Sequence, residues 1–173
     1  MNEQKNLMPA DRLPYLFQFD LPWKDEVYGD GTMEQTGCGP TSLAMALGGL
    51  LGQNFSPKEI ADYAQANGYY VDGAGTAWAF FTDFPQLYGI PVWQSAADEN
   101  LVQQELDAGN VLILSMGPGD FTTSGHIICA QSGDEPGSLN VHDPNSKNNS
   151  RKWPISTVLA QARAIFVLQN PPQ

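Results

Sequence analysis

The segment at residues 37–42, with the sequence Gly-Cys-Gly-Pro-Thr-Ser, runs directly into an apolar stretch and constrains the fold more than any other part of the chain. Leu43 and Leu47 begin a row of apolar residues at helical spacing, which predicts a helix buried along one stripe. Pro40 suits the first turn of this helix, because the amide hydrogen that proline lacks has no acceptor there. Cys38 is therefore expected at the helix N-terminus, where the helix dipole stabilises a thiolate and two flanking glycines leave room for another chain.

Only two histidines are available as a base, and both lie in predicted strands. His126 begins the β-branched run at residues 126–130 and follows a glycine, which is typical of a strand entered through a turn. His142 lies near the end of a second predicted strand, residues 138–143, which Pro144 terminates. A nearby base decides whether Cys38 can be a nucleophile, since a cysteine without one is most often a small buried apolar side chain.

The alternation of side chains along the second strand distinguishes the two histidines. Leu139, Val141 and Asp143 share one face, which the two apolar residues mark as the core side, and His142 is on the other. A carboxylate at the inner edge needs a partner, and His126 is the natural one if the two strands are neighbours. The pattern therefore predicts that Asp143 pairs with His126 and that His142 is an ordinary surface residue.

Three residues then fit three catalytic roles. Cys38 attacks the substrate, His126 accepts and returns a proton, and Asp143 fixes the imidazole tautomer and stabilises the imidazolium. The order of cysteine, histidine and acid along the chain is expected when a helix carries the nucleophile and a later sheet carries the base. Each signal is weak alone, but the sequence offers almost no other candidates.

These motifs resemble those of a known family. Residues 28–45 are similar to the nucleophile motif of the cysteine peptidase family 39-like group, relatives of the double-glycine leader peptidases that process bacteriocins. Residues 118–126 resemble the histidine motif of the group, and residues 141–146 resemble its acid motif. The resemblance extends over about residues 16–166, nearly the whole chain.

The resemblance implies a bacterial thiol peptidase with a papain-like α+β fold, in which a catalytic helix packs on an antiparallel sheet. It assigns Cys38 as the nucleophile, His126 as the base and Asp143 as the orienting acid. The expected partner is a peptide or protein substrate, with sites at small residues such as Gly-Gly as a first guess. The resemblance also implies a secreted or cell-surface protein.

One departure from the family pattern concerns the oxyanion hole. Papain-like and leader-peptidase relatives usually carry a stabilising glutamine six residues before the cysteine, and here that position is Thr32, while Gln35 is three before. The backbone N–H of Cys38 supplies one oxyanion donor. Gln35 is favoured over Thr32 as the second donor, because its longer side chain carries an N–H₂ group. A solvated Gln35 and a slow enzyme remain an open alternative.

Charge excludes some partners. The net charge of −11 argues against nucleic acid and anionic membrane surfaces, which attract clustered lysine and arginine. An acidic groove would tolerate a cationic or neutral peptide, but the charge is better explained by solubility. No run approaches the ~18 apolar residues of a membrane span, so membrane insertion is not expected.

Length and the N-terminal sequence bear on organisation. The 173 residues suit a single papain-like peptidase domain, residues 1–173, which we expect to be a monomer. Residues 1–12 lack the basic-then-apolar pattern of a signal peptide, so either the chain is cytosolic or a signal has been removed.

The second cysteine and the metal-ligand patterns point to no cofactor. Cys129 follows His126 by three residues on the same strand and should face the opposite side, so we expect it to pack in the core without bonding Cys38. The sequence contains no Cys-x-x-Cys or His-x-x-x-His spacing. A metal held by Cys38, His126 and Asp143 is chemically feasible but not expected.

The remaining elements predict helices first and mostly strands afterwards, which is typical of an α+β fold. The expected helices are at residues 57–68, 76–88 (with Pro85 kinking or ending it), 98–108 and 155–162, and the expected strands are at 111–114 and 164–168. The glycine-containing loop 117–124 is expected to line a groove, while 68–75 is either groove wall or connector.

Three functions are compatible with these residues. A thiol peptidase hydrolyses an acyl-enzyme, an acyl or amide transferase passes the acyl group to an amine, and a catalytically silent module only binds peptide. The joint presence of Cys38, His126 and Asp143 argues against the silent module. The sequence does not separate the two enzymes, and we favour the peptidase on the family resemblance.

Overall fold

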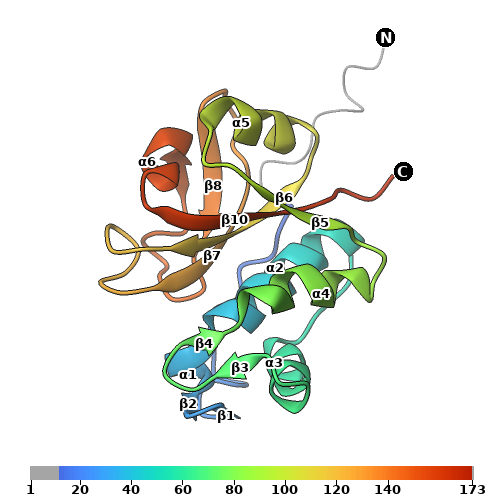
Figure 1. Cartoon of the computed structure of the whole chain (residues 1–173), viewed down its shortest axis with the longest axis vertical. Coiled ribbons are helices and arrows are strands. Elements are labelled where there is room, and N and C mark those ends of the chain that lie inside the picture. Colours follow the sequence, from blue (N-terminus) through green and yellow to red (C-terminus); the bar gives the residue numbers. More distant parts are fainter. Residues whose placement is uncertain (1–11, 173) are drawn as a thin grey trace.

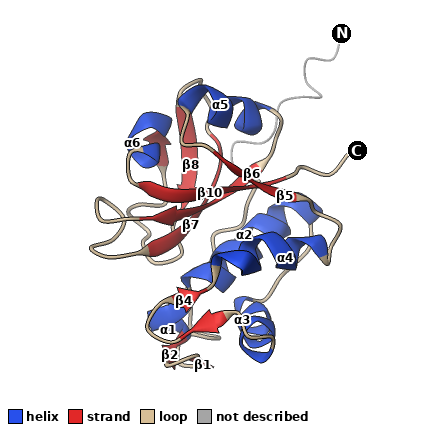
Figure 2. Cartoon of the chain, viewed as in Figure 1, coloured by secondary structure: helices blue, strands red, loops and turns tan. Residues whose placement is uncertain are grey.

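The centre of the structure is a six-stranded sheet in which every neighbouring pair is antiparallel (Figure 2). This computed structural model describes residues 12–172, so the expectation about a signal peptide lies almost wholly outside the described residues. In spatial order the strands are β5 (Val92–Ser95), β10 (Ala162–Leu168), β6 (Val111–Met116), β7 (His126–Ser132), β8 (Ser138–His142) and β9 (Lys152–Pro154). The α+β class and the antiparallel sheet are as predicted.

The helices and two small hairpins complete the fold. The helices are α1 (Met33–Thr36), α2 (Cys38–Leu51), α3 (Pro57–Ala66), α4 (Trp78–Gln86), α5 (Glu99–Asp107) and α6 (Ile155–Leu159). The hairpins pair β1 (Val27–Tyr28) with β2 (Gly31–Thr32), and β3 (Tyr70–Val71) with β4 (Gly75–Thr76). The predicted helices are all present; α6 is shorter than expected, and Pro85 lies one residue before the end of α4.

The helix α2 is the buried centre of one layer. Every residue from Gly39 to Gly48 is buried, because the helix is enclosed by the sheet, α3 and α4 (Figure 1). The sequence predicted burial along one stripe of this helix only, whereas the helix is buried on all sides over these residues. The last backbone carbonyls of a helix normally lack hydrogen-bond donors. At the C-terminus of α2, Gly52 adopts the left-handed conformation and its N–H donates to the carbonyl oxygen of Gly48.

Each face of the sheet carries its own apolar core. On the α2 side, Val111, Ile113 and Phe166 pack with α2, α3 and α4. On the other side, Leu112, Leu114 and others pack with α5 and α6. Because β6 supplies residues to both cores, it reads in sequence as a continuous apolar run, as predicted.

The arrangement brings the N-terminus of α2 to the beginning of β7. Ser42 Oγ, one turn into α2, donates to the backbone oxygen of Ile127 at 3.4 Å, next to His126. Two segments far apart in the sequence are thus held at one end of the sheet. Between residues 12 and 172, no helix is both long enough and apolar enough to cross a bilayer.

Candidate active site

Cys38 is the first residue of α2, as predicted, and its thiol is free. The glycines on either side of Cys38 make room for other segments of the protein itself, and not for a substrate. A Cβ at Gly37 would lie 2.5 Å from the backbone oxygen of Met33, and one at Gly39 would lie 2.8 Å from Thr76 Oγ1. The glycines therefore let α1 and the β3–β4 hairpin close on the start of α2.

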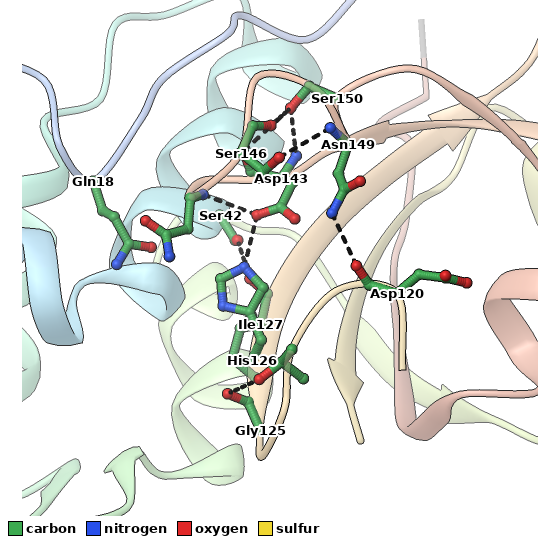
Figure 3. Close-up of polar contacts among 12 residues, drawn as sticks. Gln18, Ser42, Asp120, Gly125, His126, Ile127, Asp143, Ser146, Asn149 and Ser150 are labelled. Atoms are coloured by element: carbon green, nitrogen blue, oxygen red, sulfur yellow. Dashed lines mark hydrogen bonds and ion pairs between the residues drawn. The ribbon is translucent and has the colours of Figure 1, made fainter. Parts of the chain in front are cut away.

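His126 and Asp143 form a buried pair (Figure 3). His126 Nε2 lies 2.7 Å from Asp143 Oδ1, and the two side chains are 8% and 1% exposed. Asp143 Oδ1 also accepts a hydrogen bond from the backbone N–H of Asn145 at 2.8 Å. With Nε2 engaged by the acid, the other ring nitrogen is left to face Cys38. The structure thus brings together the three residues that the sequence singled out.

Electrostatics favours a charged imidazole at this position. Burial acts to lower the pKa of His126, but hydrogen bonds with Asp143 and Cys38 and the charges of both outweigh it and raise the pKa to about 10. A charged imidazole here lies beside Cys38, at the N-terminus of α2. The structure therefore places a positively charged ring next to the free thiol of Cys38.

The loop after β8 holds Asp143 in place (Figure 3). The Asp143 N–H donates to Ser150 Oγ at 2.9 Å, and the Ser150 hydroxyl is 2.8 Å from the backbone oxygen of Ser146. Asn149 donates from its side chain to the backbone oxygen of Asp120 at 3.2 Å, which ties this loop to the one that leads into β7. The acid and the base are thus held by one hydrogen-bond network that joins the two loops.

Gln18 belongs to the same region, and the sequence analysis missed it. Its backbone N–H donates to the oxygen of Pro144 at 2.8 Å, and its Nε2 donates to the oxygen of Glu34 at 2.6 Å. Gln18 is 2% exposed, and its Oε1 has no hydrogen-bond partner within the described residues. It connects the acid loop to α1. No local pattern marks it, since its partners are distant in sequence.

His142 corrects one sequence prediction. It is fully buried, not a surface residue: its ring nitrogens lie 3.1 Å from Gln131 Nε2 and 3.1 Å from the oxygen of Pro14. Its ring also stacks on Tyr15, with centroids 4.1 Å apart. The prediction failed because the N-terminal segment covers this face of β8, and strand periodicity cannot reveal which distant segment does so.

Cys129 is a core residue, as predicted, and forms no disulfide. Burial raises its pKa above that of an ordinary thiol. The expectation that it lies across the sheet from Cys38 is wrong, because both residues belong to the apolar cluster on the α2 side. His126 reaches Cys38 from the end of its strand, where strict alternation does not decide the direction of a side chain.

Gln35 and Thr32, the expected oxyanion residues, lie at the start of α1. Gln35 Oε1 accepts a hydrogen bond from the Thr32 N–H at 3.0 Å, as in a helix capping box. Neither residue is among those lining the cleft at Cys38 in the described part of the chain. The structure therefore gives Gln35 a capping position and does not bring it to the nucleophile.

A cleft of about 500 Å³ opens at Cys38 and His126. Both glycine-containing segments contribute to it, through Gly73–Thr76 on one wall and Pro118, Ser124 and Gly125 on the other; Trp78, Ser115, Ile127 and Arg163 complete the lining. No Asp or Glu of the described residues lines it. The cleft is therefore not the acidic groove that the net charge of the chain had suggested as one explanation.

A hydroxyl pair lies at the cleft beside the nucleophile. Tyr28 Oη and Thr76 Oγ1 are 2.6 Å apart, and Tyr28 is fully buried. Burial raises the pKa of Tyr28, and the charge of Cys38 adds to this, so the phenol stays protonated. Within residues 12–172, no group of three or more His, Cys, Asp or Glu side chains is arranged to hold a metal ion.

Known structures share this fold. The peptidase domain of Streptococcus ComA, a bi-functional ABC transporter involved in a quorum sensing pathway, matches with a TM-score of 0.59 at 18% identity, over 78% of this chain and 93% of that one. A Bacillus anthracis protein described as a C39-like peptidase matches with a TM-score of 0.58 at 14% identity, over 93% and 96%. Among curated proteins, no sequence matches significantly. Residues 11–166 match the model of the Peptidase_C39 like family, and the chain therefore belongs to that family.

Proposed function

We propose that this protein is a cysteine peptidase that hydrolyses a peptide or protein substrate through a Cys38–His126–Asp143 triad. The observation that carries the proposal is the position of His126, which is held at 2.7 Å by a buried carboxylate and hydrogen-bonds Cys38. Family membership supports the reaction class. The cleft at Cys38 provides the space that a peptide chain requires.

The reaction then follows two steps. Cys38 Sγ attacks the scissile carbonyl carbon, a C–S bond forms, and the C–N bond breaks as the His126 imidazolium gives its proton to the leaving nitrogen. Water next attacks the thioester, His126 accepts the water's proton, and the C–S bond breaks to release the acid. Asp143 keeps the imidazole oriented throughout and stabilises its charged form.

The oxyanion of each tetrahedral intermediate needs donors near Cys38. The backbone N–H of Cys38, at the start of α2, supplies one. In our proposal Thr76 supplies the second: Thr76 lines the cleft, its hydroxyl lies against the first turn of α2, and it is 2.6 Å from the buried Tyr28 phenol. In this proposal the Tyr28 phenol donates to Thr76 Oγ1, which leaves the Thr76 proton to point at the oxyanion.

The test is mass spectrometry of a mixed peptide library incubated with the wild type and with Cys38→Ala. We expect cleavage by the wild type and none by the variant, while Cys129→Ala retains cleavage because that thiol is in the core. An added primary amine separates the two enzyme classes: hydrolysis yields free acids, whereas a transferase yields amides. Products that remain unchanged by loss of Cys38, or a library left intact by the wild type, would refute the peptidase.

A further inference from the structure

Arg163 occupies an irregular position in β10. The register pairs Ala162 with Met116 and Ala164 with Ser115, so Arg163 is an extra residue between two successive pairs. Such a bulge leaves one residue outside the ladder and changes the direction of its side chain. Bulges are common next to active sites, where they direct a side chain into the site.

The side chain of Arg163 is directed at the cleft that contains Cys38 and His126. A Cβ at Gly117 would lie 3.1 Å from Arg163 Nε, and a Cβ at Gly125 would lie 3.3 Å from Nη1. Both positions are glycines, and Gly125 immediately precedes the base. The guanidinium therefore passes between the two ends of the loop 117–125 and reaches the wall beside His126.

Among residues 12–172, the charge of Arg163 has no ion-pair or hydrogen-bond partner. Each other Lys or Arg between residues 12 and 172 contacts a carboxylate, a carbonyl or an aromatic ring: Arg12 with Gly49, Lys24 with Asp25, Lys58 with Asp62, Lys147 with Phe17, Arg151 with Trp153, and Lys152 with Asp134. No such contact of the Arg163 guanidinium occurs among the described residues. None of the many acidic residues in the described part of the chain lines this cleft.

We propose that Arg163 binds a substrate carboxylate, and that the substrates of this enzyme carry an acidic group close to the scissile bond. An arginine fork matches a carboxylate with two parallel hydrogen bonds, and the exposed side chain of Arg163 is accessible to a substrate in the cleft. The carboxylate comes either from an Asp or Glu side chain or from the C-terminus of the peptide. This inference rests on the proposed peptidase function and identifies its substrate class.

Matched peptide pairs test the preference and identify the carboxylate source. Each pair has Glu or Gln at one position near the cleavage site, or a free or amidated C-terminus. For the preferred position, Arg163→Gln should lower kcat/KM for the carboxylate peptide by about two- to fivefold, as expected for an exposed ion pair, and leave kcat/KM for its amide partner unchanged. Arg163→Glu should reverse the preference, so that a peptide with Lys at this position is cleaved faster than the peptide with Glu.

The control Arg151→Gln removes an exposed arginine stacked on Trp153, outside the cleft lining, and should change kcat/KM for neither peptide of a pair. Equal effects of Arg163→Gln on both members of every pair would overturn the proposal.

Alkylation of Cys38 keeps this inference separable from the peptidase proposal. Iodoacetate carries a carboxylate and iodoacetamide is its neutral counterpart, and neither requires hydrolysis. Arg163→Gln should reduce the ratio of the iodoacetate rate to the iodoacetamide rate by about two- to tenfold, since it removes one positive charge from the cleft. A reduced ratio without any peptide cleavage would reject the peptidase and retain the carboxylate site. An unchanged ratio together with no cleavage would reject both.

Discussion

At the scale of single residues, the acid is the side chain whose loss has the clearest consequence. Asp143→Asn retains an oxygen that can accept from His126 and from the Asn145 N–H. Asp143→Ala removes the acceptor and leaves both donors buried without it. We expect the alanine variant to have a kcat at least about tenfold below that of the asparagine variant, and a free energy of unfolding lower by about 1–3 kcal/mol.

Steady-state kinetics and urea unfolding of the two variants test this. His142→Ala is the control, because His142 packs on Tyr15 away from the triad: it should lower stability but leave the kcat of the folded protein unchanged. Turnover that survives Asp143→Ala and disappears in His142→Ala would mean that the acid has been misassigned.

The raised pKa of His126 predicts a pH-dependent stability. Its pKa rises from 6.5 in the unfolded chain to about 10 in the folded protein. The stabilisation by the charged ring is therefore fully present below about pH 6.5 and is lost as the pH rises through about 10. Urea unfolding should show the largest gap between wild type and His126→Gln near pH 6 and a smaller gap near pH 10. A gap independent of pH in this range would contradict a charged imidazole.

The hydroxyl pair provides a separate test of the oxyanion donor. Thr76→Val keeps the shape of the side chain and removes its proton donor, so kcat should fall by about 10² with little change in KM. Tyr28→Phe should have a smaller effect, because it acts through Thr76. Thr157→Val, in α6 on the far side of the sheet, is the matched control. Normal turnover in Thr76→Val together with a loss in Gln35→Ala would restore the glutamine to that role.

At the scale of elements, the loop between β8 and β9 determines how firmly the acid is held. Ser150 Oγ accepts from the Asp143 N–H and lies 2.8 Å from the Ser146 oxygen, so Ser150→Ala removes both links. We expect stability to fall by about 1 kcal/mol and kcat to fall with it, because Asp143 no longer fixes the imidazole. The exposed Ser156 in α6 is the control for a serine-to-alanine change. Equal kcat in the two variants would show that the loop is held without Ser150.

At the scale of the whole molecule, the two cysteines report on different states of the chain. Cys38 lies at a cleft beside a charged histidine, whereas Cys129 is fully buried in the core. Iodoacetamide should therefore label Cys38 rapidly at pH below about 8, and Cys129 only as the protein unfolds. Intact-mass measurement across a urea gradient checks both: the second label should appear together with the loss of secondary structure if residues 1–173 unfold as one domain. Equal labelling rates in the native protein would overturn the nucleophile assignment.

The sequence alone was sufficient to predict local features. The helix that begins at Cys38, the strand that begins at His126 and the strand that ends beside Asp143 follow from the spacing of apolar residues and from Pro and Gly positions, and such signals act over a few residues. The small number of histidines and cysteines reduced the choice of candidates further, which is why all three proposed triad residues were identified.

Only the tertiary structure decided which segments cover one another. Local periodicity specifies the two faces of β8 but not that Pro14 and Tyr15 bury His142. It cannot place Gln18 against Pro144 or Thr76 against the start of α2, because these contacts join distant segments. The direction of Arg163 depends on a bulge, a mismatch between two strands that neither strand encodes alone. Packing between distant segments therefore determined the walls of the cleft, while the residues at its centre could be predicted from the chain itself.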